Sequence, residues 1–333
     1  LVSCSQPENY RTPDQHVAGV LPANENLLSR SIVLDFHCDT PIRLVEENLD
    51  LGKLHTSGEL DIPRMRQGGI TGVFFSIYTE ATDKTALEAV KKALEIIDAV
   101  VEETHRHPRE LTLATSPEEI ISAKQAGKIA ILMGVEGGHM IDSSLSVLRT
   151  FYRLGVRYLT LTHSASTGWA DTAGGSEGLT DFGKDVVCEM NRLGMMVDIS
   201  HVSDKTFFDV IRTSKAPIIA SHSSCRALAS HARNMTDEML QALAASGGVI
   251  HINYYNAFLD DNYSCQDHTC VELEKERSVV RKQLGDNKRQ LAMKTHQINH
   301  EKTERIGRVP LSRLLDHFEH AVKVAGIDHV GMG

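Results

Sequence analysis

Residues 31–41 read Ser-Ile-Val-Leu-Asp-Phe-His-Cys-Asp-Thr-Pro, an apolar run that ends in His37 and Asp39 just before a proline. Residues two apart on a β-strand point to the same face, so these two side chains would project together from the end of one buried strand. An imidazole and a carboxylate placed in this way can bind a borderline metal such as zinc. A buried histidine that only hydrogen-bonds a neighbouring aspartate is the alternative interpretation of this stretch alone.

The same pattern recurs along the chain, because other apolar runs also end in a polar side chain. One run ends in Glu136 followed by two glycines, and three more end in His163, His201 and His222. Together with residues 31–41, the eight expected strands lie within residues 72–78, 129–136, 158–163, 195–201, 217–222, 248–255 and 329–333. Segments with a helical period separate most of them, as in residues 85–104.

Strands that alternate with helices predict a parallel sheet buried on both faces, which explains why these strands are almost wholly apolar. Eight such units predict an α/β fold of the (β/α)8 TIM-barrel type. A doubly wound open sheet is the alternative, but its ligand site lies at one switch in strand order. In a barrel, the carboxyl ends of all the strands converge on one mouth, where polar residues from nearly every strand can meet.

Composition agrees with one large barrel domain. The chain has 333 residues, of which 41% are hydrophobic, so it can bury an extensive core. The net charge of −9 and the absence of a dominant basic patch argue against a nucleic acid partner. No internal segment is long and apolar enough to predict a membrane-spanning helix.

Both ends of the sequence look cut, because there is no initial Met and the last expected strand stops at Gly333. The opening residues Leu1-Val-Ser-Cys4 resemble the cleavage box of a bacterial lipoprotein signal, in which the cysteine carries the lipid. We therefore expect residues 1–30 to be a tether and lead-in, with the protein lipid-anchored through Cys4 outside the cytoplasm, in the periplasm or at the cell surface. An arbitrary disordered end is the alternative.

We expect residues 31–333 to form the barrel, incomplete at its C-terminus. One segment interrupts the alternation of strands and helices. Residues 260–308 are rich in Lys, Glu, Arg and Gln, with a thin apolar stripe that mostly repeats every seven residues. We interpret this segment as a helix or helical hairpin inserted after the seventh strand. A solvated helix packed on the barrel edge is the favoured role, and a partner surface or a flap over the mouth is the alternative.

The polar residues at the strand ends suggest a metal centre with more than one ion. Single zinc sites use about three or four protein ligands, whereas five candidates occur here: His37, Asp39, Glu136, His201 and His222. Five ligands favour two metals that share a carboxylate and bracket a water or hydroxide. Glu136 is the natural bridge, because it lies between the two groups of ligands in the sequence.

At this point the chain resembles a known family, the membrane or renal-type dipeptidases, which are zinc peptidases of the amidohydrolase superfamily. The similar pieces occur in the same order as in the family, over about residues 31–333. They are Asp35-Phe-His-Cys-Asp-Thr-Pro41, Glu136-Gly-Gly138, Leu161-Thr-His163, Asp198-Ile-Ser-His-Val-Ser203, Ser221-His-Ser-Ser224, His231-Ala-Arg-Asn-Met235 and Asn253-Tyr-Tyr255.

The resemblance implies two Zn²⁺ ions. His37 and Asp39 would hold one, His201 and His222 the other, and Glu136 would bridge both. His163 would polarise the substrate at the scissile bond.

Arg233 and Tyr255 would bind the terminal carboxylate of a dipeptide or the developing oxyanion, and the resemblance places the catalytic acid beyond Gly333. The predicted function is hydrolysis of dipeptides by a hydroxide that bridges two metals. The expected partners are a dipeptide and, through Cys4 only, a membrane, and a homodimer is left open. The alternatives are another amidohydrolase acting on a cyclic amide or lactone, and a non-catalytic surface lipoprotein with the same fold.

Overall fold

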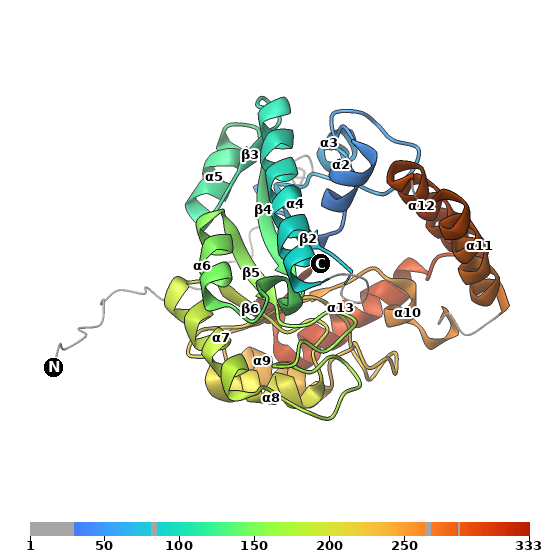
Figure 1. Cartoon of the computed structure of the whole chain (residues 1–333). Helices are drawn as coiled ribbons and strands as arrows, with labels where there is room; N and C mark the ends of the chain where they lie inside the picture. The colour runs from blue at the N-terminus through green and yellow to red at the C-terminus, as the bar shows by residue number, and fades with distance from the viewer. Residues whose placement is uncertain (1–29, 81–84, 264–267, 286) are drawn as a thin grey trace, which may run out of the picture. The chain divides into compact units, whose positions relative to one another are not determined.

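Strands and helices alternate from Leu34 onward in the computed structural model of the chain (Figure 1). The structure describes residues 30–80, 85–263, 268–285 and 287–333. Contacts divide the chain into Leu1–Ser31 and Ile32–Gly333, and the barrel belongs entirely to the second unit. The proposed lipid attachment at Cys4 lies outside the described residues and stays a prediction. Within the described part of the chain, no helix has the length and apolarity needed to cross a bilayer.

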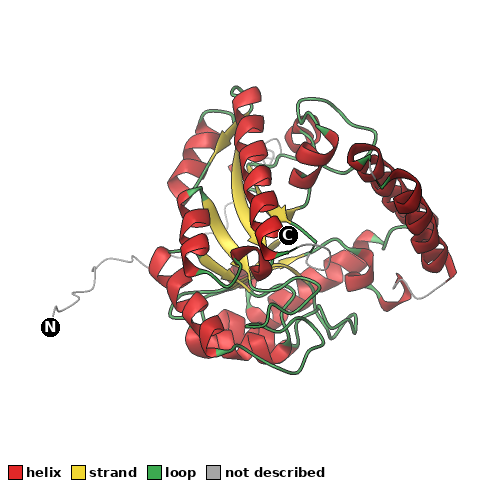
Figure 2. Cartoon of the chain, in the orientation of Figure 1, coloured by secondary structure: helices red, strands yellow, loops and turns green. Residues whose placement is uncertain are grey.

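Eight parallel strands form a closed ring, which Figure 2 shows in yellow inside a layer of helices. The ring runs β1 (Leu34–Cys38), β2 (Gly72–Tyr78), β4 (Ile129–Glu136), β5 (Val156–Thr160), β6 (Met196–Asp198), β7 (Ile219–Ser223), β8 (Val249–Ile252) and β9 (Val330–Met332). Pairing of β9 with β1 and of β2 with β4 closes it. The (β/α)8 barrel expected from the sequence is confirmed, and the open-sheet alternative is wrong.

A ninth described strand, β3 (Leu111–Leu113), lies outside this ring and was not expected from the sequence. It pairs with residues 129–131 of β4, whereas β5 pairs with residues 133–136 of the same strand. Because β2 pairs along nearly the whole of β4, β3 and β5 share its other edge. Three residues are too short a run to produce a recognisable alternation of faces.

The described α-helices follow the strands along the chain, and most of them cover the outside of the ring. They are α2 (Pro41–Glu47), α3 (Ile62–Gln67), α4 (Ala86–Arg106), α5 (Pro117–Gln125), α6 (Leu145–Arg153), α7 (Asp181–Leu193), α8 (Asp204–Thr213), α9 (Asp237–Ala245), α10 (Asn256–Leu259), α11 (His268–Leu284), α12 (Lys288–Ile306) and α13 (Leu311–Ala325). Local sequence sets several of their starts: Thr85 and Glu88 form a reciprocal capping box at α4, and the Ser116 hydroxyl caps α5.

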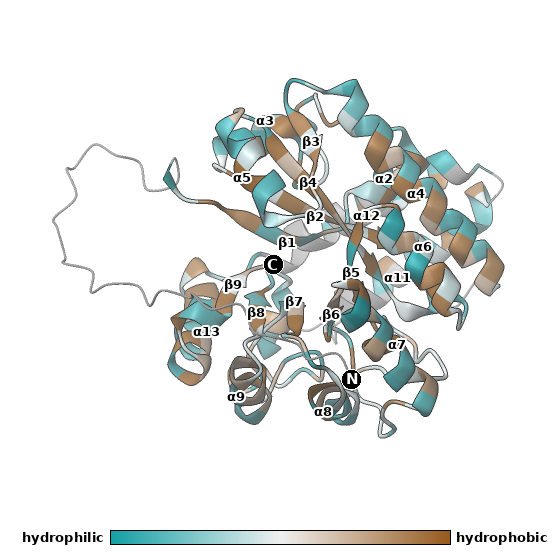
Figure 3. Cartoon of the chain, turned by 90° about the vertical axis from the view of Figure 1, so that its left-hand side faces the viewer, coloured by the Kyte–Doolittle hydropathy of each residue, from teal (hydrophilic) through white to brown (hydrophobic). Residues whose placement is uncertain are grey.

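Side chains of the inner strand faces form an apolar floor beneath the barrel mouth. On β4, Leu132, Gly134 and Glu136 point to the same side, because strand residues alternate. Leu132 packs in a buried cluster with Phe74 and Tyr158, and Figure 3 shows β2 and β4 largely in the brown of apolar residues. A Cβ at Gly134 would lie 2.0 Å from the Tyr158 ring, so only glycine leaves room for this tyrosine. Glu136 therefore lies at the carboxyl end of β4, above an apolar floor.

The described part of residues 260–308 contains two α-helices, α11 and α12, which lie side by side after β8, the seventh strand of the ring (Figure 1). Helix α12 also packs against α2, the helix that directly follows β1. Leu273 and Ile298 of the expected apolar stripe are buried, and so is Ala292. The hairpin thus packs against the segment that follows His37 and Asp39, at the carboxyl end of the barrel.

Candidate metal centre

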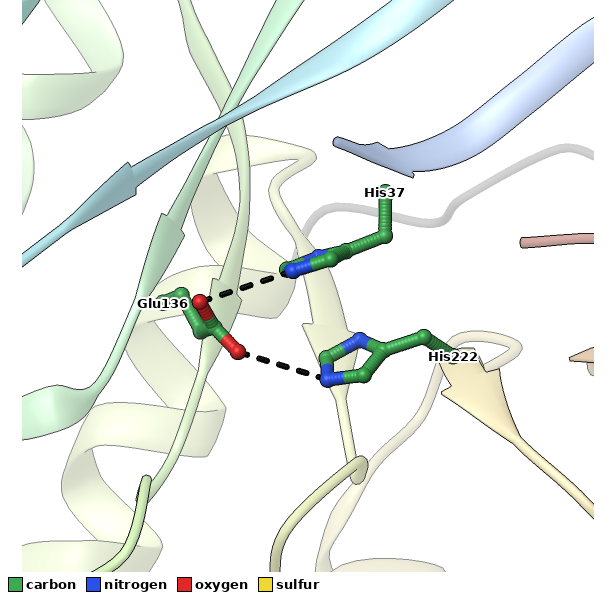
Figure 4. Close-up of side chains that lie close together, drawn as sticks. All are labelled: His37, Glu136 and His222. Atoms are coloured by element: carbon green, nitrogen blue, oxygen red, sulfur yellow. Dashed lines mark ion pairs between the residues drawn. The ribbon is translucent and has the colours of Figure 1, made fainter. Parts of the chain in front are cut away.

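Glu136 lies at the middle of a cluster of four imidazoles, and Figure 4 shows two of them, His37 and His222, on either oxygen of the carboxylate. Its Oε2 is 3.4 Å from His37 Nε2, which comes from β1. Its Oε1 is 3.1 Å from His201 Nε2 and 3.3 Å from His222 Nε2. His163 Nε2 lies slightly farther away, 3.7 Å from the same oxygen. The two carboxylate oxygens thus face two different groups of histidines.

The fifth expected ligand, Asp39, lies at the outer edge of the cluster. Its Oδ1 is 3.3 Å from His37 Nε2, and 67% of its side chain is exposed, against 4% for Glu136. On the opposite side of Glu136, His201 Nε2 and His222 Nε2 are only 2.8 Å apart. The structure therefore brings all five expected ligands together, with His163 beside them.

Two glycines allow the chain to turn away directly after Glu136. Gly137 has a φ of 120°, and a Cβ there would lie 2.5 Å from the ring of His139. A Cβ at Gly138 would lie 2.4 Å from Trp169 and 2.5 Å from a backbone oxygen. Side chains at either position would push the end of β4 away from its neighbours, so the Glu-Gly-Gly sequence is a requirement of the local packing.

His201 reaches the cluster from an unusual backbone conformation. It lies three residues beyond the end of β6 and has a φ of 72°, in the left-handed region that residues other than glycine rarely adopt. Its carbonyl accepts hydrogen bonds from the Thr162 hydroxyl at 2.9 Å and from Ala173 N at 2.7 Å. These bonds hold a strained residue inside the imidazole cluster. The expected strand over residues 195–201 is therefore too long, since β6 ends at Asp198.

The charges of the cluster suit metal ligands. Burial raises the pKa of Glu136, but the charge of His37 and a hydrogen bond from His201 outweigh it and hold that pKa well below its usual range. Burial lowers the pKa of His201 to about 3, with help from the charge of Arg233. Burial, and then the charge of His37, hold the pKa of His222 well below its usual value. Near neutral pH the cluster thus offers a carboxylate and two neutral imidazoles.

His37 behaves differently in the absence of metal. Burial would lower its pKa, but the charge of Glu136, followed by Tyr158 and Asp39, raises it well above 6.5. A proton on His37 then supplies the positive charge that the buried Glu136 needs. A divalent cation would supply the same charge, and imidazole with carboxylate is a donor set that zinc prefers. The residues present therefore fit a metal.

Arg233 and Tyr255, which are expected to bind the substrate carboxylate, both contact Phe258. The Arg233 guanidinium is over the Phe258 ring at 5.2 Å, and its Nη2 donates to the carbonyl of His222 at 3.0 Å. Arg233 Nε is buried without a partner, and burial lowers the pKa of Arg233 only to about 10. Tyr255 packs edge-on against Phe258 and is half exposed. The guanidinium is thus charged at neutral pH and retains an unused donor.

Sequence reasoning missed two aromatic neighbours of the site. Tyr78, the last residue of β2, packs with its ring tilted against that of His163, and the ring centroids are 4.5 Å apart. Tyr158, from the apolar floor, places its hydroxyl 3.1 Å from His37 Nδ1. The position of Tyr78 at a strand end is the one signal that could have revealed it, whereas the sequence around Tyr158 is that of an ordinary core residue.

Stability of the protein stripped of metal should fall as the pH drops below 6.5. His201 has a pKa of about 3 when folded and 6.5 as the ordinary value, so only the unfolded chain takes up this proton between these limits. By pH 5 this histidine alone should have lowered the free energy of unfolding by about 2 kcal/mol. His37 does not mask the effect: its raised pKa contributes stability that is fully present below 6.5 and is lost only at higher pH.

The measurement is urea unfolding in the presence of a chelator at pH 6.5 and pH 5, for the wild type and for His201→Asn. Asparagine tolerates a positive φ, so this variant removes the titrating group with little backbone penalty. The variant should lose less stability over this interval than the wild type. Equal losses in both proteins would mean that His201 is not held neutral by burial.

A closed (β/α)8 barrel with imidazoles and carboxylates at the carboxyl ends of its strands defines a metal-dependent hydrolase of the barrel class. Comparison with known proteins makes this specific. Residues 22–333 match the model of the membrane dipeptidase family, peptidase family M19. The chain belongs to this family and is a metallo-dipeptidase, as expected from the sequence.

Individual relatives agree with this membership. An uncharacterized dipeptidase of Schizosaccharomyces pombe is 34% identical over 323 residues, which cover 90% of this chain and 68% of the relative. A metallopeptidase from Rhodobacter sphaeroides, solved with a phosphinate mimic of the dipeptide L-Ala-D-Ala, is 26% identical with a TM-score of 0.73, over 91% of this chain and 85% of that chain. The probable dipeptidase PvdM from Pseudomonas aeruginosa has the same fold, at 24% identity and a TM-score of 0.74, over 92% and 84% of the two chains.

Proposed function

We propose that the cluster holds two zinc ions, one between His37, Asp39 and Glu136 and one between Glu136, His201 and His222, and that the substrate is a dipeptide with a free carboxylate. The observation that carries the proposal is that the two oxygens of the Glu136 carboxylate face different histidines. Its Oε2 faces His37, whereas its Oε1 faces His201 and His222. A carboxylate with two oxygens directed to two groups of ligands suits a bridge between two metals.

When bound, such a metal pair lowers the pKa of a water molecule and withdraws charge from a carbonyl oxygen. The chain supplies the remaining parts. His163 Nε2 lies 3.7 Å from Glu136 Oε1 and can donate a hydrogen bond to the carbonyl oxygen of the scissile peptide bond. A donor fixed in this position stabilises the charge that develops on that oxygen.

Arg233 would determine the length of the substrate. Its guanidinium is charged and buried, and its Nε has no partner, so a carboxylate at this position would gain a strong, charge-assisted hydrogen bond. The half-exposed Tyr255 packs against the same Phe258 and can add its hydroxyl to the carboxylate. A fixed anchor for a free C-terminus near the metals favours dipeptides over longer chains.

The proposal is tested by hydrolysis of Ala-Ala and Ala-Ala-Ala by the zinc-loaded protein, with L-Ala-D-Ala included because the Rhodobacter sphaeroides relative binds a mimic of it. We expect rapid cleavage of the dipeptides, at most slow cleavage of the tripeptide, loss of activity with a chelator and recovery with zinc. Equal rates on the dipeptide and tripeptide would contradict the anchor. Activity that survives complete removal of metal would contradict the metal centre.

A further inference from the structure

Behind His222, away from the metal cluster, three buried side chains form a relay of hydrogen bonds that runs from His222 through Ser221 to Asp198. His222 Nδ1 is 2.8 Å from the Ser221 hydroxyl, and this hydroxyl donates to Asp198 Oδ2 at 2.7 Å. Asp198 and Ser221 are completely buried, and His222 is buried as well. None of the sequence patterns or comparisons assigns a role to Asp198 or Ser221.

The direction of each bond follows from counting hydrogens around Asp198. Its Oδ1 accepts from the backbone N–H groups of Ser200 at 3.1 Å and Ser221 at 2.8 Å. Its Oδ2 accepts from the hydroxyls of Thr160 at 2.6 Å and Ser221 at 2.7 Å. Four donors around one carboxyl group are matched by an ionised carboxylate, which only accepts.

A serine hydroxyl has a single hydrogen, and in Ser221 that hydrogen is donated to Asp198. Toward His222 the Ser221 oxygen can therefore only accept, so the hydrogen of the neutral imidazole lies on Nδ1. The lone pair is then on Nε2, the atom that lies 3.3 Å from Glu136 Oε1. In the opposite tautomer, a hydrogen on Nε2 would occupy the direction from which a metal binds.

We propose that Asp198 and Ser221 are positioning residues that fix the tautomer of His222, with its hydrogen on Nδ1 and its Nε2 prepared to bind metal. The inference rests on the proposed metal site, because it assumes that Nε2 is the ligand atom. Unlike that proposal, it concerns two residues that are not themselves metal ligands or substrate contacts. The tautomer of His222 can also be observed without any metal.

His37 on the opposite side of Glu136 has the same arrangement, built from different residues. Its Nδ1 is 3.1 Å from the Tyr158 hydroxyl, which donates to the carbonyl of Phe36 at 3.4 Å. Here again the hydroxyl gives its only hydrogen to a fixed acceptor and leaves its oxygen for Nδ1–H of the histidine. Two histidines on separate strands thus each have a hydroxyl that orients Nε2 toward Glu136.

The first test replaces the relay hydroxyl. Ser221→Ala should weaken zinc binding, measured by competition with a chromogenic chelator, by about 10- to 100-fold, as is typical when a partner of a metal ligand is removed. The matched control is Ser224→Ala, because Ser224 is equally buried and its hydroxyl has no partner. Ser224→Ala should bind zinc as tightly as the wild type. Equal affinities for Ser221→Ala and the wild type would overturn the proposal.

The second test reads the tautomer directly in protein stripped of metal. Long-range ¹H–¹⁵N spectra of ¹⁵N-histidine-labelled protein distinguish the two neutral tautomers, and the spectrum of His222→Gln assigns the signal. Wild-type His222 should carry its hydrogen on Nδ1. A hydrogen on Nε2 would refute the relay, even if the protein binds zinc and cleaves dipeptides. A wild type that binds no zinc but has the Nδ1–H tautomer would refute the metal proposal instead.

Asp198→Asn should reverse the relay while keeping the shape of the side chain. An amide NH₂ in place of Oδ2 would donate to Ser221, whose hydrogen would then turn toward His222 Nδ1 and move the imidazole hydrogen to Nε2. We expect the His222 signal to change tautomer and zinc affinity to fall about 10- to 100-fold. Thr160→Val, which removes the other hydroxyl on Asp198 Oδ2, should leave the tautomer unchanged. An unchanged tautomer in Asp198→Asn would contradict the proposed direction of the bonds.

Discussion

Glu136→Gln should reduce kcat/KM for dipeptides by at least about 10³-fold, because a neutral amide cannot balance the charge of two cations and offers one oxygen where the site uses two. A loss of several kcal/mol of stabilisation of transition-state charge corresponds to this factor. Zinc binding should fall along with activity. Binding of both metals should be affected, because Oε2 faces His37 and Oε1 faces His201 and His222.

The matched control is Glu103→Gln, which changes another carboxylate that is only 3% exposed, as is Glu136. Glu103 accepts from Leu51 N at 2.7 Å and pairs with Arg106 at 2.8 Å, so its replacement should cost stability but leave zinc content unchanged. If Glu136→Gln retained both zinc and most of the activity, Glu136 would not be a bridging ligand.

Arg233→Lys should lower kcat/KM for dipeptides by about 30- to 5000-fold, mainly through a higher KM. Removing one partner of a buried charged pair costs roughly 2–5 kcal/mol, and a lysine cannot present the planar fork that binds a carboxylate with two parallel bonds. The native guanidinium has a donor, Nε, that is buried and unpaired. The same lysine would also lose the bond from Nη2 to the carbonyl of His222.

A substrate without the carboxylate separates the anchor role from general damage. The wild type should strongly prefer Ala-Ala over its C-terminal amide, because only the former pairs with Arg233. In Arg233→Lys this preference should shrink, since the variant has lost the group that distinguishes the two. A variant that kept the full wild-type preference, at any absolute rate, would show that another residue recognises the C-terminus.

The strand ends could be predicted from the sequence because the apolar run and the polar residue that ends it are neighbours in the chain. An apolar run shows a buried strand, and the polar residue that ends it lies at the barrel mouth, as for Glu136 at the end of β4 and His222 within β7. The geometry of a parallel barrel then brings such residues together from distant parts of the chain. His37 and His222 come from β1 and β7, yet their rings stack at 3.7 Å.

What could not be read from the sequence depends on register and backbone conformation. The left-handed φ of His201 is set by hydrogen bonds from Thr162 and Ala173, which have no sequence signature of their own. The pairing of Tyr158 with His37 requires the relative heights of β1 and β5. Asp198 did carry a signal, since a carboxylate inside the apolar run 195–199 has to be paired when buried, but its partner Ser221 is in a different strand.

The most direct test of the metal centre is anomalous diffraction at the zinc edge from crystals of the zinc-loaded protein. We expect two peaks on either side of the Glu136 carboxylate, one beside His37 and Asp39 and the other beside His201 and His222. A second, partly buried cluster of carboxylates and an imidazole, Asp50, Glu103 and His107, serves as an internal comparison. It should show no peak, because Lys53 and Arg106 already balance its carboxylates. A single peak at Glu136, or zinc bound only at the second cluster, would contradict the two-metal centre.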